Sequence, residues 1–491
     1  MSSAIFDLLF LQHEYALHSH RARESYPAGK ARLIALAVVF LLLTSAVVTR
    51  LYFVQIEYRS FWLKRAQGQH ETEITVAGAR GRIIDSAGRI LASSIQAGSL
   101  ALHPGDVAEQ ERPVLAARLG SLLDRPAKDI ETLLAKKTPF VWLERGLPIE
   151  LVDSIGAEQL SGVVVLNEFR RYYPQGPLAG SVLGWVGRDR TGLSGVERAF
   201  DQALSATSLE VPVRRDARGH FVAAMPDDQT SAPSSLLSRV AFWGAGPEPL
   251  SNVTRSDAIR HEGGEIQLSI DSYVQAIVEE EFERGRAAAR SKRVFGVVMD
   301  ADSGEVLAMA AAPRRFNPNE IDGVSPRELR NEVIQDSFEP GSTLKPIVAS
   351  AVLDSGLVSA NERLDCEASG RYRVGPHIVR DVHPVGIGTL RDVLVRSSNI
   401  CMAKLGQRLG ARSLYRALRD FGLGQSTEIE LPGEASGILR SPEQWKTIDV
   451  ATHSFGQGVA VTSLQLVRAY ATLANGGYLV QPTILKRNAG A

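Results

Sequence analysis

The sequence predicts a membrane-anchored protein with two folded regions, each of which combines helices and strands. Residues 33–49, LIALAVVFLLLTSAVVT, contain no charge. After them, segments with period-two hydrophobicity alternate with segments of period 3.6, as expected of strands and helices. Between 226 and 260 periodicity is lost, and Pro, Ser, Gly and Asp are frequent. A chain of 491 residues is too long for one compact core, and its length alone suggests about three domains.

The composition is that of an ordinary globular protein and excludes some classes of function. Lys plus Arg is 55 and Asp plus Glu is 55, and no dense basic stripe with aromatic residues suggests nucleic-acid binding. Cys366 and Cys401 are too few for a disulfide framework or a C-x-x-C metal site. We expect two isolated thiols, and an oxidised pair outside the cytoplasm is the alternative.

The N-terminal apolar run predicts one uncleaved transmembrane helix over residues 33–56. The uncharged part alone is near the shortest length that spans a bilayer, about 17 residues, but Arg50 can snorkel to the headgroups and LYFVQI then extends the run. A cleaved signal peptide is the alternative, but residues 1–32 are a long lead and the run is long for a signal. Four basic residues lie close to each end, so charge counting does not set the orientation.

The first folded region is expected over residues 57–224 and is followed by a linker over 225–264. Alternating apolar residues and the turn at 86–88 predict two strands joined as a hairpin. Helical spacing predicts short amphipathic helices between 108 and 137. FVWLERGLP and GVVVLNEFRRYYP are typical of strands followed by loops, and SGVERAFD of a short helix.

The second folded region begins near residue 265. EIQLSIDSYVQAIVEEEFERGRAAAR changes from strand to helix periodicity. VFGVVMDADSGEVLAMAA predicts a hairpin around the turn at 302–304.

The stretch FEPGSTLKPIVAS places Ser342 three residues before Lys345 at the predicted start of a helix. Pro346 is tolerated only in a first helical turn, which makes Ser342 the expected N-cap at the helix mouth. An unprotonated Lys345 could then accept the Ser342 hydroxyl proton during attack on a carbonyl. The alternative is a capping serine followed by a solvated lysine, and S-x-x-K alone does not decide between them.

A second motif, Ser397-Ser398-Asn399, lies between two predicted helices. Ser397 could relay a proton between Lys345 and a leaving amine, and Asn399 could bind a substrate amide or hold Lys345. An ordinary helix cap is the alternative, since Ser and Asn are common caps.

Taken together, these motifs resemble the penicilloyl serine transferases, which use S-x-x-K, S-x-N and K-T-G. The wider resemblance is to class B penicillin-binding proteins, the monofunctional peptidoglycan D,D-transpeptidases, of the division type. ARGRIIDSAGRILASS resembles their R-G-x-I-x-D-x-x-G-x-x-L-A signature. GLSGVERAFD, VVMDADSGEVLAMAA and HSFGQGVAVTSLQLVRAYATLANGG match the family in the same order.

The resemblance implies an α+β pedestal of the dimerisation type and an α/β transpeptidase domain, a sheet flanked by helices, over 265–491. It implies that Ser342 is acylated, that Lys345 is the general base, and that Ser397 and Asn399 complete the proton relay. It also implies a cytoplasmic tail, a catalytic domain outside the bacterial inner membrane, and no cofactor or metal.

The same resemblance implies what the protein binds. Peptidoglycan stem peptides are the expected substrates and β-lactams the expected inhibitors. The expected partners are a polytopic membrane glycosyltransferase and other cell-wall or division proteins.

Two departures from the family pattern accompany the resemblance. The segment 226–260 is longer than is usual, and we interpret it as a loop insertion. The sequence ends at ILKRNAGA without the K-T-G strand, which predicts a truncated copy of an active enzyme or an inactive product. The first alternative is therefore a non-catalytic scaffold in a cell-wall complex. The second is a membrane-bound β-lactamase or β-lactam sensor that shares the S-x-x-K fold, against which the pedestal with its R-G-x-I-x-D signature argues.

Other candidate sites are weak. His377 and His383 have no carboxylate at metal spacing and are expected to be solvated or hydrogen-bonded. GLGQS lacks the remaining glycine of a nucleotide fingerprint. Gly456 and Gly458 are expected to allow close backbone approach beside the cleft.

Overall fold

The computed structural model describes residues 27–62, 71–206, 208–215, 221–223, 262–314, 316–321 and 323–487. Most of the expected tail and most of the expected linker lie outside these residues. Packing groups the described residues up to 74 with those of 211–223, and the remaining described residues form a second unit. The domain boundaries given above stay predictions.

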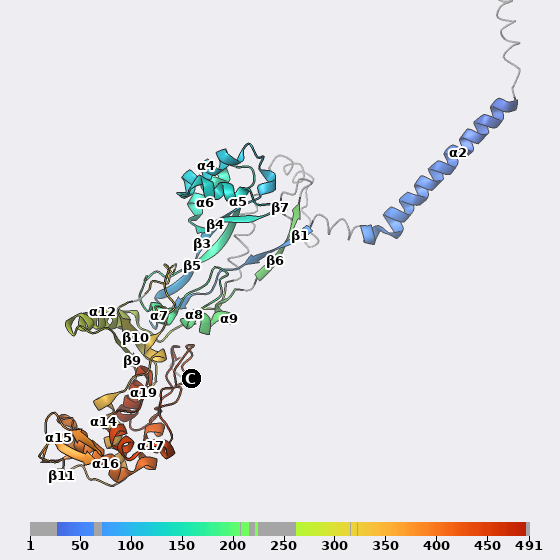
Figure 1. Cartoon of the computed structure of the whole chain (residues 1–491). Coiled ribbons are helices and arrows are strands. Elements are labelled where there is room, and N and C mark those ends of the chain that lie inside the picture. The colour runs from blue at the N-terminus through green and yellow to red at the C-terminus, as the bar shows by residue number, and fades with distance from the viewer. Residues whose placement is uncertain are drawn as a thin grey trace, which may run out of the picture. The chain divides into compact units, whose positions relative to one another are not determined.

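The first unit contains the apolar N-terminal helix. Helix α2 (Pro27–Tyr52), blue in Figure 1, continues into the π-helical turn η1 (Phe53–Glu57). Residues Ala31–Glu57 are long and apolar enough to cross a membrane, about 40 Å at the rise of an α-helix. The predicted apolar helix is confirmed as a candidate membrane span, and its bounds and its being uncleaved stay predictions. Strands β1 (Glu71–Ala77), β6 (Ser208–Arg215) and β7 (Phe221–Ala223) form a three-stranded sheet.

The pedestal is built on a sheet in the order β4-β3-β2-β8, with β5 also paired to β3. Strands β2 and β3 form the predicted hairpin, whose turn is closed by Asp85 and Gly88. The strands of this sheet are β2 (Ile83–Ile84), β3 (Ile90–Leu102), β4 (Val141–Leu147), β5 (Val163–Tyr172) and β8 (Ile266–Gln267).

Helices at the end of this sheet cover a core that includes Leu100, Leu119 and Ile130, each fully buried. The helices α4, α5 and α6 lie together over β3, β4 and β5 (Figure 1). The helical segments of the pedestal are η2 (Pro104–Asp106), α4 (Arg112–Leu123), α5 (Ala127–Leu134), α6 (Ile149–Ala157), α7 (Gly180–Leu183), α8 (Gly195–Ala199) and α9 (Asp201–Leu204). The helices expected in 108–137 and at SGVERAFD are confirmed.

The second folded region opens with the predicted strand-to-helix change. Asp271 caps α12 (Ser272–Ala288) by accepting from the N–H groups of Tyr273 and Val274. The predicted hairpin of β9 (Val294–Met299) and β10 (Val306–Ala312) follows. Helix α12 packs on β10 and α19 (Ser463–Ala474) packs on β9, so that helices flank the hairpin.

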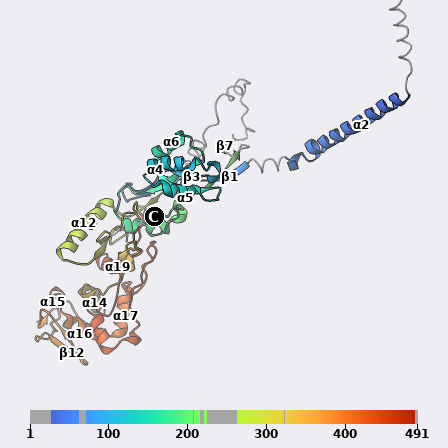
Figure 2. The same ribbon diagram turned by 45° about the horizontal axis from the view of Figure 1, so that its top comes forward.

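A further core surrounds α14, and α14, α16 and α17 lie together in both views (Figures 1 and 2). Leu344, Ile347, Val348 and Met402 are among its fully buried residues. The helical segments are α13 (Glu332–Gln335), η3 (Gly341–Leu344), α14 (Lys345–Asp354), α15 (Leu390–Val395), α16 (Asn399–Leu409), α17 (Ala411–Asp420), η4 (Pro442–Gln444) and α18 (Thr447–His453).

A small excursion, residues 364–388, leaves this core and returns to it. Strands β11 (Leu364–Asp365) and β14 (Ile387–Gly388) pair at its base, and β12 (Arg371–Val374) and β13 (His377–Arg380) form a hairpin within it. At the chain's far end, Lys486 Nζ forms an ion pair with Glu305, 2.7 Å apart, beside the start of β10.

Candidate active site

Ser342 lies in a 3-10 turn that leads directly into α14. The turn is η3, and Lys345 is the first residue of α14. Pro346 is therefore the second residue of the helix, where its missing N–H leaves no bond unmade. The expectation that Ser342 is the N-cap is wrong: Leu344 occupies the cap position of α14, and no side-chain cap bond is present there. The Ser342 hydroxyl therefore makes no capping hydrogen bond, and the Ser342 side chain is exposed.

The Ser397-Ser398-Asn399 turn divides its three side chains between two tasks. Ser398, fully buried, is the N-cap of α16, and its Oγ accepts from the N–H of Cys401 at 3.0 Å. Ser397 has φ of 54°, the left-handed region that is unfavourable for residues other than glycine. Asn399 is the first residue of α16. Because the middle serine supplies the cap, the outer two side chains are left for other contacts.

The side chains of Ser397 and Asn399 converge on the Lys345 amine. Lys345 Nζ donates to Ser397 Oγ at 2.9 Å, to the Ser397 carbonyl at 2.7 Å and to Asn399 Oδ1 at 2.7 Å. Ser397 Oγ in turn donates to Ser342 Oγ at 2.9 Å. The structure therefore brings all four sequence-predicted residues into one hydrogen-bonded chain.

Burial changes the proton affinity of Lys345. Its side chain is 2% exposed, and within the described part of the chain no carboxylate forms an ion pair with it. Burial lowers the pKa of Lys345 from 10.5 to about 8, and the charge of Asp381 opposes this only in part. A lysine with this pKa is deprotonated in about a tenth of molecules at pH 7, instead of fewer than about one in a thousand. The amine can therefore accept a proton at neutral pH.

A second wall of the site comes from the segment after α18. Phe338 and Val461 pair as neighbouring strands do, with N–O distances of 3.0 and 2.9 Å. Gly341 N–H donates to the Gly456 carbonyl at 2.9 Å. A Cβ on Gly456, whose φ is 82°, would lie 2.0 Å from the Gly341 oxygen. The close backbone approach expected at Gly456 is confirmed, and it fixes the residue next to Ser342.

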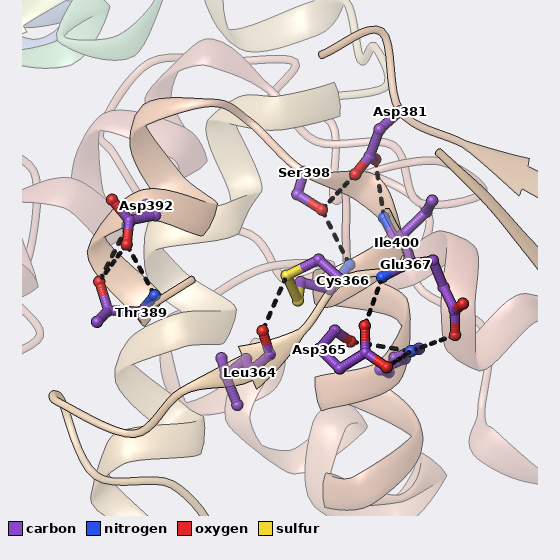
Figure 3. Close-up of a disulfide and its surroundings, with 11 residues drawn as sticks. Leu364, Asp365, Cys366, Glu367, Asp381, Thr389, Asp392, Ser398 and Ile400 are labelled. Carbon is purple, nitrogen blue, oxygen red and sulfur yellow. Dashed lines mark hydrogen bonds and ion pairs between the residues drawn. A yellow bond between two sulfur atoms is a disulfide. The ribbon is translucent and has the colours of Figure 1, made fainter. Parts of the chain in front are cut away.

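Cys366 and Cys401 form a disulfide, so the expectation of two isolated thiols is wrong. The excursion brings the two sulfurs together although 35 residues separate them in sequence. Figure 3 shows the disulfide beside Ser398 and Asp381. The pairing depends on the tertiary path of the excursion, which sequence spacing does not reveal.

Asp381 is a supporting residue that sequence reasoning missed. Its carboxylate accepts from Ser398 Oγ at 2.5 Å and from the N–H of Ile400 at 3.0 Å (Figure 3). A carboxylate at the first turn of a helix is also favoured by the helix dipole. The only sequence signal for Asp381 is that it is the acidic residue of RVGPHIVRDVHPVG, a segment in which the two histidines are the more conspicuous candidates.

The two histidines of that segment make no metal centre with their neighbours. His377 begins β13 and His383 follows Asp381 in a loop, and both are exposed. Among residues that the structure describes, no group of three His, Cys, Asp or Glu side chains has metal-site geometry.

The arrangement can support nucleophilic attack by Ser342. Ser342 Oγ can pass its proton to Ser397 Oγ while Ser397 Oγ passes its own proton to an unprotonated Lys345. The same two proton transfers can run in reverse and deliver a proton to a leaving amine. Asn399 Oδ1 orients the lysine throughout.

The chain is similar in sequence and in fold to known proteins. Residues 75–234 match the family model described as Penicillin-binding Protein dimerisation domain, and residues 294–490 match that of the Penicillin binding protein transpeptidase domain. The chain is 30% identical over 456 residues to the "Probable peptidoglycan D,D-transpeptidase PenA" of Neisseria meningitidis, covering 93% of this chain and 72% of that one.

Two further similarities cover less of the other protein. The chain is 33% identical to the "Peptidoglycan D,D-transpeptidase FtsI" of Escherichia coli, over 82% of this chain and 63% of that one. A crystal structure of penicillin binding protein 3 of Mycobacterium tuberculosis with aztreonam aligns with a TM-score of 0.56 and 27% identity, covering 84% of this chain and 68% of that one.

Proposed function

Because this chain belongs to the class B penicillin-binding proteins, we propose that it is a peptidoglycan D,D-transpeptidase that works through a serine acyl-enzyme. The observation that carries the proposal is the hydrogen-bonded chain from Lys345 through Ser397 to Ser342. The exposed hydroxyl at one end is the proposed nucleophile, and the buried amine at the other is the proposed base.

The reaction consists of two acyl transfers. Ser342 Oγ attacks the carbonyl carbon of the penultimate D-Ala of a stem peptide, and its proton moves through Ser397 to Lys345. The peptide C–N bond breaks, and terminal D-Ala leaves with the proton returned by the same path. An amine of a neighbouring stem peptide then attacks the ester, forms the cross-link and releases Ser342 with its proton. A β-lactam would acylate Ser342 in the same way, and its ring C–N bond would open.

The proposed location is the outer face of the inner membrane, with α2 as the single span. The disulfide supports this orientation, since disulfides persist in oxidising compartments and are rare in the cytosol. On the outer face we propose a role in septal wall synthesis beside a polytopic membrane glycosyltransferase, the partner that the resemblance to class B penicillin-binding proteins implies. The residues that make up the pedestal motifs and the segment FEPGSTLKP favour a role in septal synthesis over a role in elongation.

The test is covalent labelling of the full-length protein by a fluorescent penicillin. We expect a label that survives denaturation in the wild type and is absent in Ser342→Ala. Thr343→Ala is the matched control, because Thr343 is the neighbour of Ser342 and its hydroxyl donates to the Pro340 carbonyl. No label on the wild type at high penicillin concentration would contradict the enzyme and favour the scaffold. Rapid turnover of a chromogenic cephalosporin would instead favour a β-lactamase.

A further inference from the structure

The disulfide joins the excursion to the first turn of the helix that carries Asn399. Cys401 is the third residue of α16, two after Asn399. Its N–H donates to the capping Ser398 Oγ, and its sulfur is bonded to Cys366 at the base of the excursion (Figure 3). One residue therefore connects the capped turn and the covalent link.

Three non-covalent contacts also join the excursion to this turn. Asp381 accepts from Ser398 Oγ and from the N–H of Ile400, and Asn399 Nδ2 donates to the Arg380 carbonyl at 3.2 Å. All these groups lie on the 364–388 excursion or on the turn itself. The position of the turn therefore depends on the position of the excursion.

The turn needs such support because its own backbone is strained. Ser397 has φ of 54° and an exposed side chain, and residues other than glycine keep this conformation only where their surroundings fix it. The hydrogen bonds between the excursion and the turn can break and reform, whereas the disulfide links the two segments covalently. The fully buried sulfur of Cys366 fixes the distance between the two segments.

We propose that the Cys366–Cys401 disulfide is a positioning device for the reaction, which holds Ser397 and Asn399 against Lys345 so that acylation of Ser342 depends on the oxidised pair. The inference rests on the proposed function of the same site. Cys366 and Cys401 touch none of the reacting atoms and act through the turn.

Loosening the turn has a consequence that a general loss of stability does not have. Ser397 and Asn399 cover the Lys345 amine, and burial is what lowers the pKa of that amine. The charge of Asp381, which belongs to the same excursion, raises the pKa of Lys345 and so only partly offsets the effect of burial. Water admitted to the amine returns its pKa toward 10.5, and acylation then requires a higher pH.

The experiment measures the second-order rate constant for acylation by a fluorescent penicillin between pH 6 and 10. The full-length wild type is compared with Cys366→Ala/Cys401→Ala and with wild type reduced by a water-soluble phosphine. In the reduction each sulfur gains an electron and a proton, and the phosphine is oxidised to its oxide with oxygen from water. Alkylation and mass spectrometry verify the two thiols.

Both the variant and the reduced protein are expected to react about 10-fold more slowly at pH 7, with the midpoint of the pH profile displaced upward, since misplacement by about 1 Å can cost up to about 100-fold. Glu367→Gln is the matched control. It removes the 2.6 Å ion pair with Lys404 that bridges the same segments one turn farther from Asn399, and it should leave the midpoint unchanged.

The outcomes separate this inference from the proposed function. Equal rates and midpoints in oxidised and reduced protein would overturn the inference alone. A slower rate with an unchanged midpoint and a lowered unfolding temperature would show a merely structural disulfide and also overturn it. Absence of label on the oxidised wild type would overturn the proposed function and the inference together. If the variant does not fold, the reduced wild type supplies the comparison.

Discussion

Lys345 and Arg80 are both buried basic residues, but the surroundings of Arg80 stabilise its charged form, whereas those of Lys345 destabilise it. Arg80, 4% exposed, contacts the carboxylates of Glu197 and Asp201 at 2.7 Å each. Lys345, 2% exposed, contacts a hydroxyl, a carbonyl and an amide oxygen, all neutral. The two carboxylates beside Arg80 stabilise its positive charge. The neutral groups around Lys345 do not offset its burial, so the pKa of the amine is lowered.

The Arg80 cluster explains two pedestal motifs in structural terms. Glu197, with no exposed side-chain area, also contacts Arg171 at 2.6 Å, so one carboxylate forms ion pairs with two guanidinium groups. Arg80 belongs to the R-G-x-I-x-D signature and Glu197 to GLSGVE, and their pairing brings the two motifs together. A buried charge that forms ion pairs indicates a structural role. A buried lysine without an ion-pair partner, next to a serine, indicates a catalytic role.

The largest expected effect comes from removing the lysine. Lys345→Met should lower the acylation rate by about 100- to 10,000-fold, the usual contribution of a general base. Stability should change little at pH 7. Loss of the buried amine relieves about 3 kcal/mol for the lowered pKa. It leaves the Ser397 carbonyl and Asn399 Oδ1 without this donor, at about 1–3 kcal/mol each, while Ser397 Oγ keeps its bond to Ser342.

The pH dependence of stability provides the check on this balance. The folded pKa of Lys345 is lowered, so wild-type stability should decrease as pH falls from 10.5 toward about 8, and this contribution should be absent in Lys345→Met. Denaturant unfolding at several pH values measures both proteins. Parallel pH dependences would contradict the assignment of the shift to Lys345.

The second-largest effect should be a loss of stability without a loss of acylation rate. Glu197→Gln leaves Arg80 and Arg171 buried beside a neutral amide and should lower the free energy of unfolding by about 3–5 kcal/mol. The acylation rate of the molecules that remain folded should be unchanged. A rate loss in fully folded protein would mean that the two clusters are not separate in function.

The sequence was sufficient to predict much of this arrangement. Helical spacing and the turn residues predicted the β9–β10 hairpin, and Pro346 predicted a helix just after Ser342, although its cap is Leu344. The resemblance to the family is what placed Ser342, Lys345, Ser397 and Asn399 in one site. The sequence did not show that Ser398 supplies the cap, because Ser and Asn serve equally as caps and as relay groups. The disulfide and Asp381 depend on the path of the excursion, and a sequence pattern contains no information on that path.

The smallest expected effect tests the wall beside Ser342. Gly456→Ala places a Cβ 2.0 Å from the Gly341 oxygen at φ of 82°, which should displace the Ser342 turn and slow acylation about 10-fold. Gly476→Ala is the control, since Gly476 has φ of 86° but no atom within 4 Å of its Cβ position. The control should share the backbone strain and keep the wild-type rate. Equal rates in both variants would show that the contact with Gly341 does not position Ser342.

The pH profile of acylation tests the central claim most directly, namely that a buried and unpaired Lys345 is the base for Ser342. The rate constant for acylation of the full-length protein by a fluorescent penicillin should rise with pH around a midpoint of about 8, where half of the lysine is deprotonated. The rise should be absent in Lys345→Met. A wild-type midpoint near 10.5, or the same rise in Lys345→Met, would contradict the account.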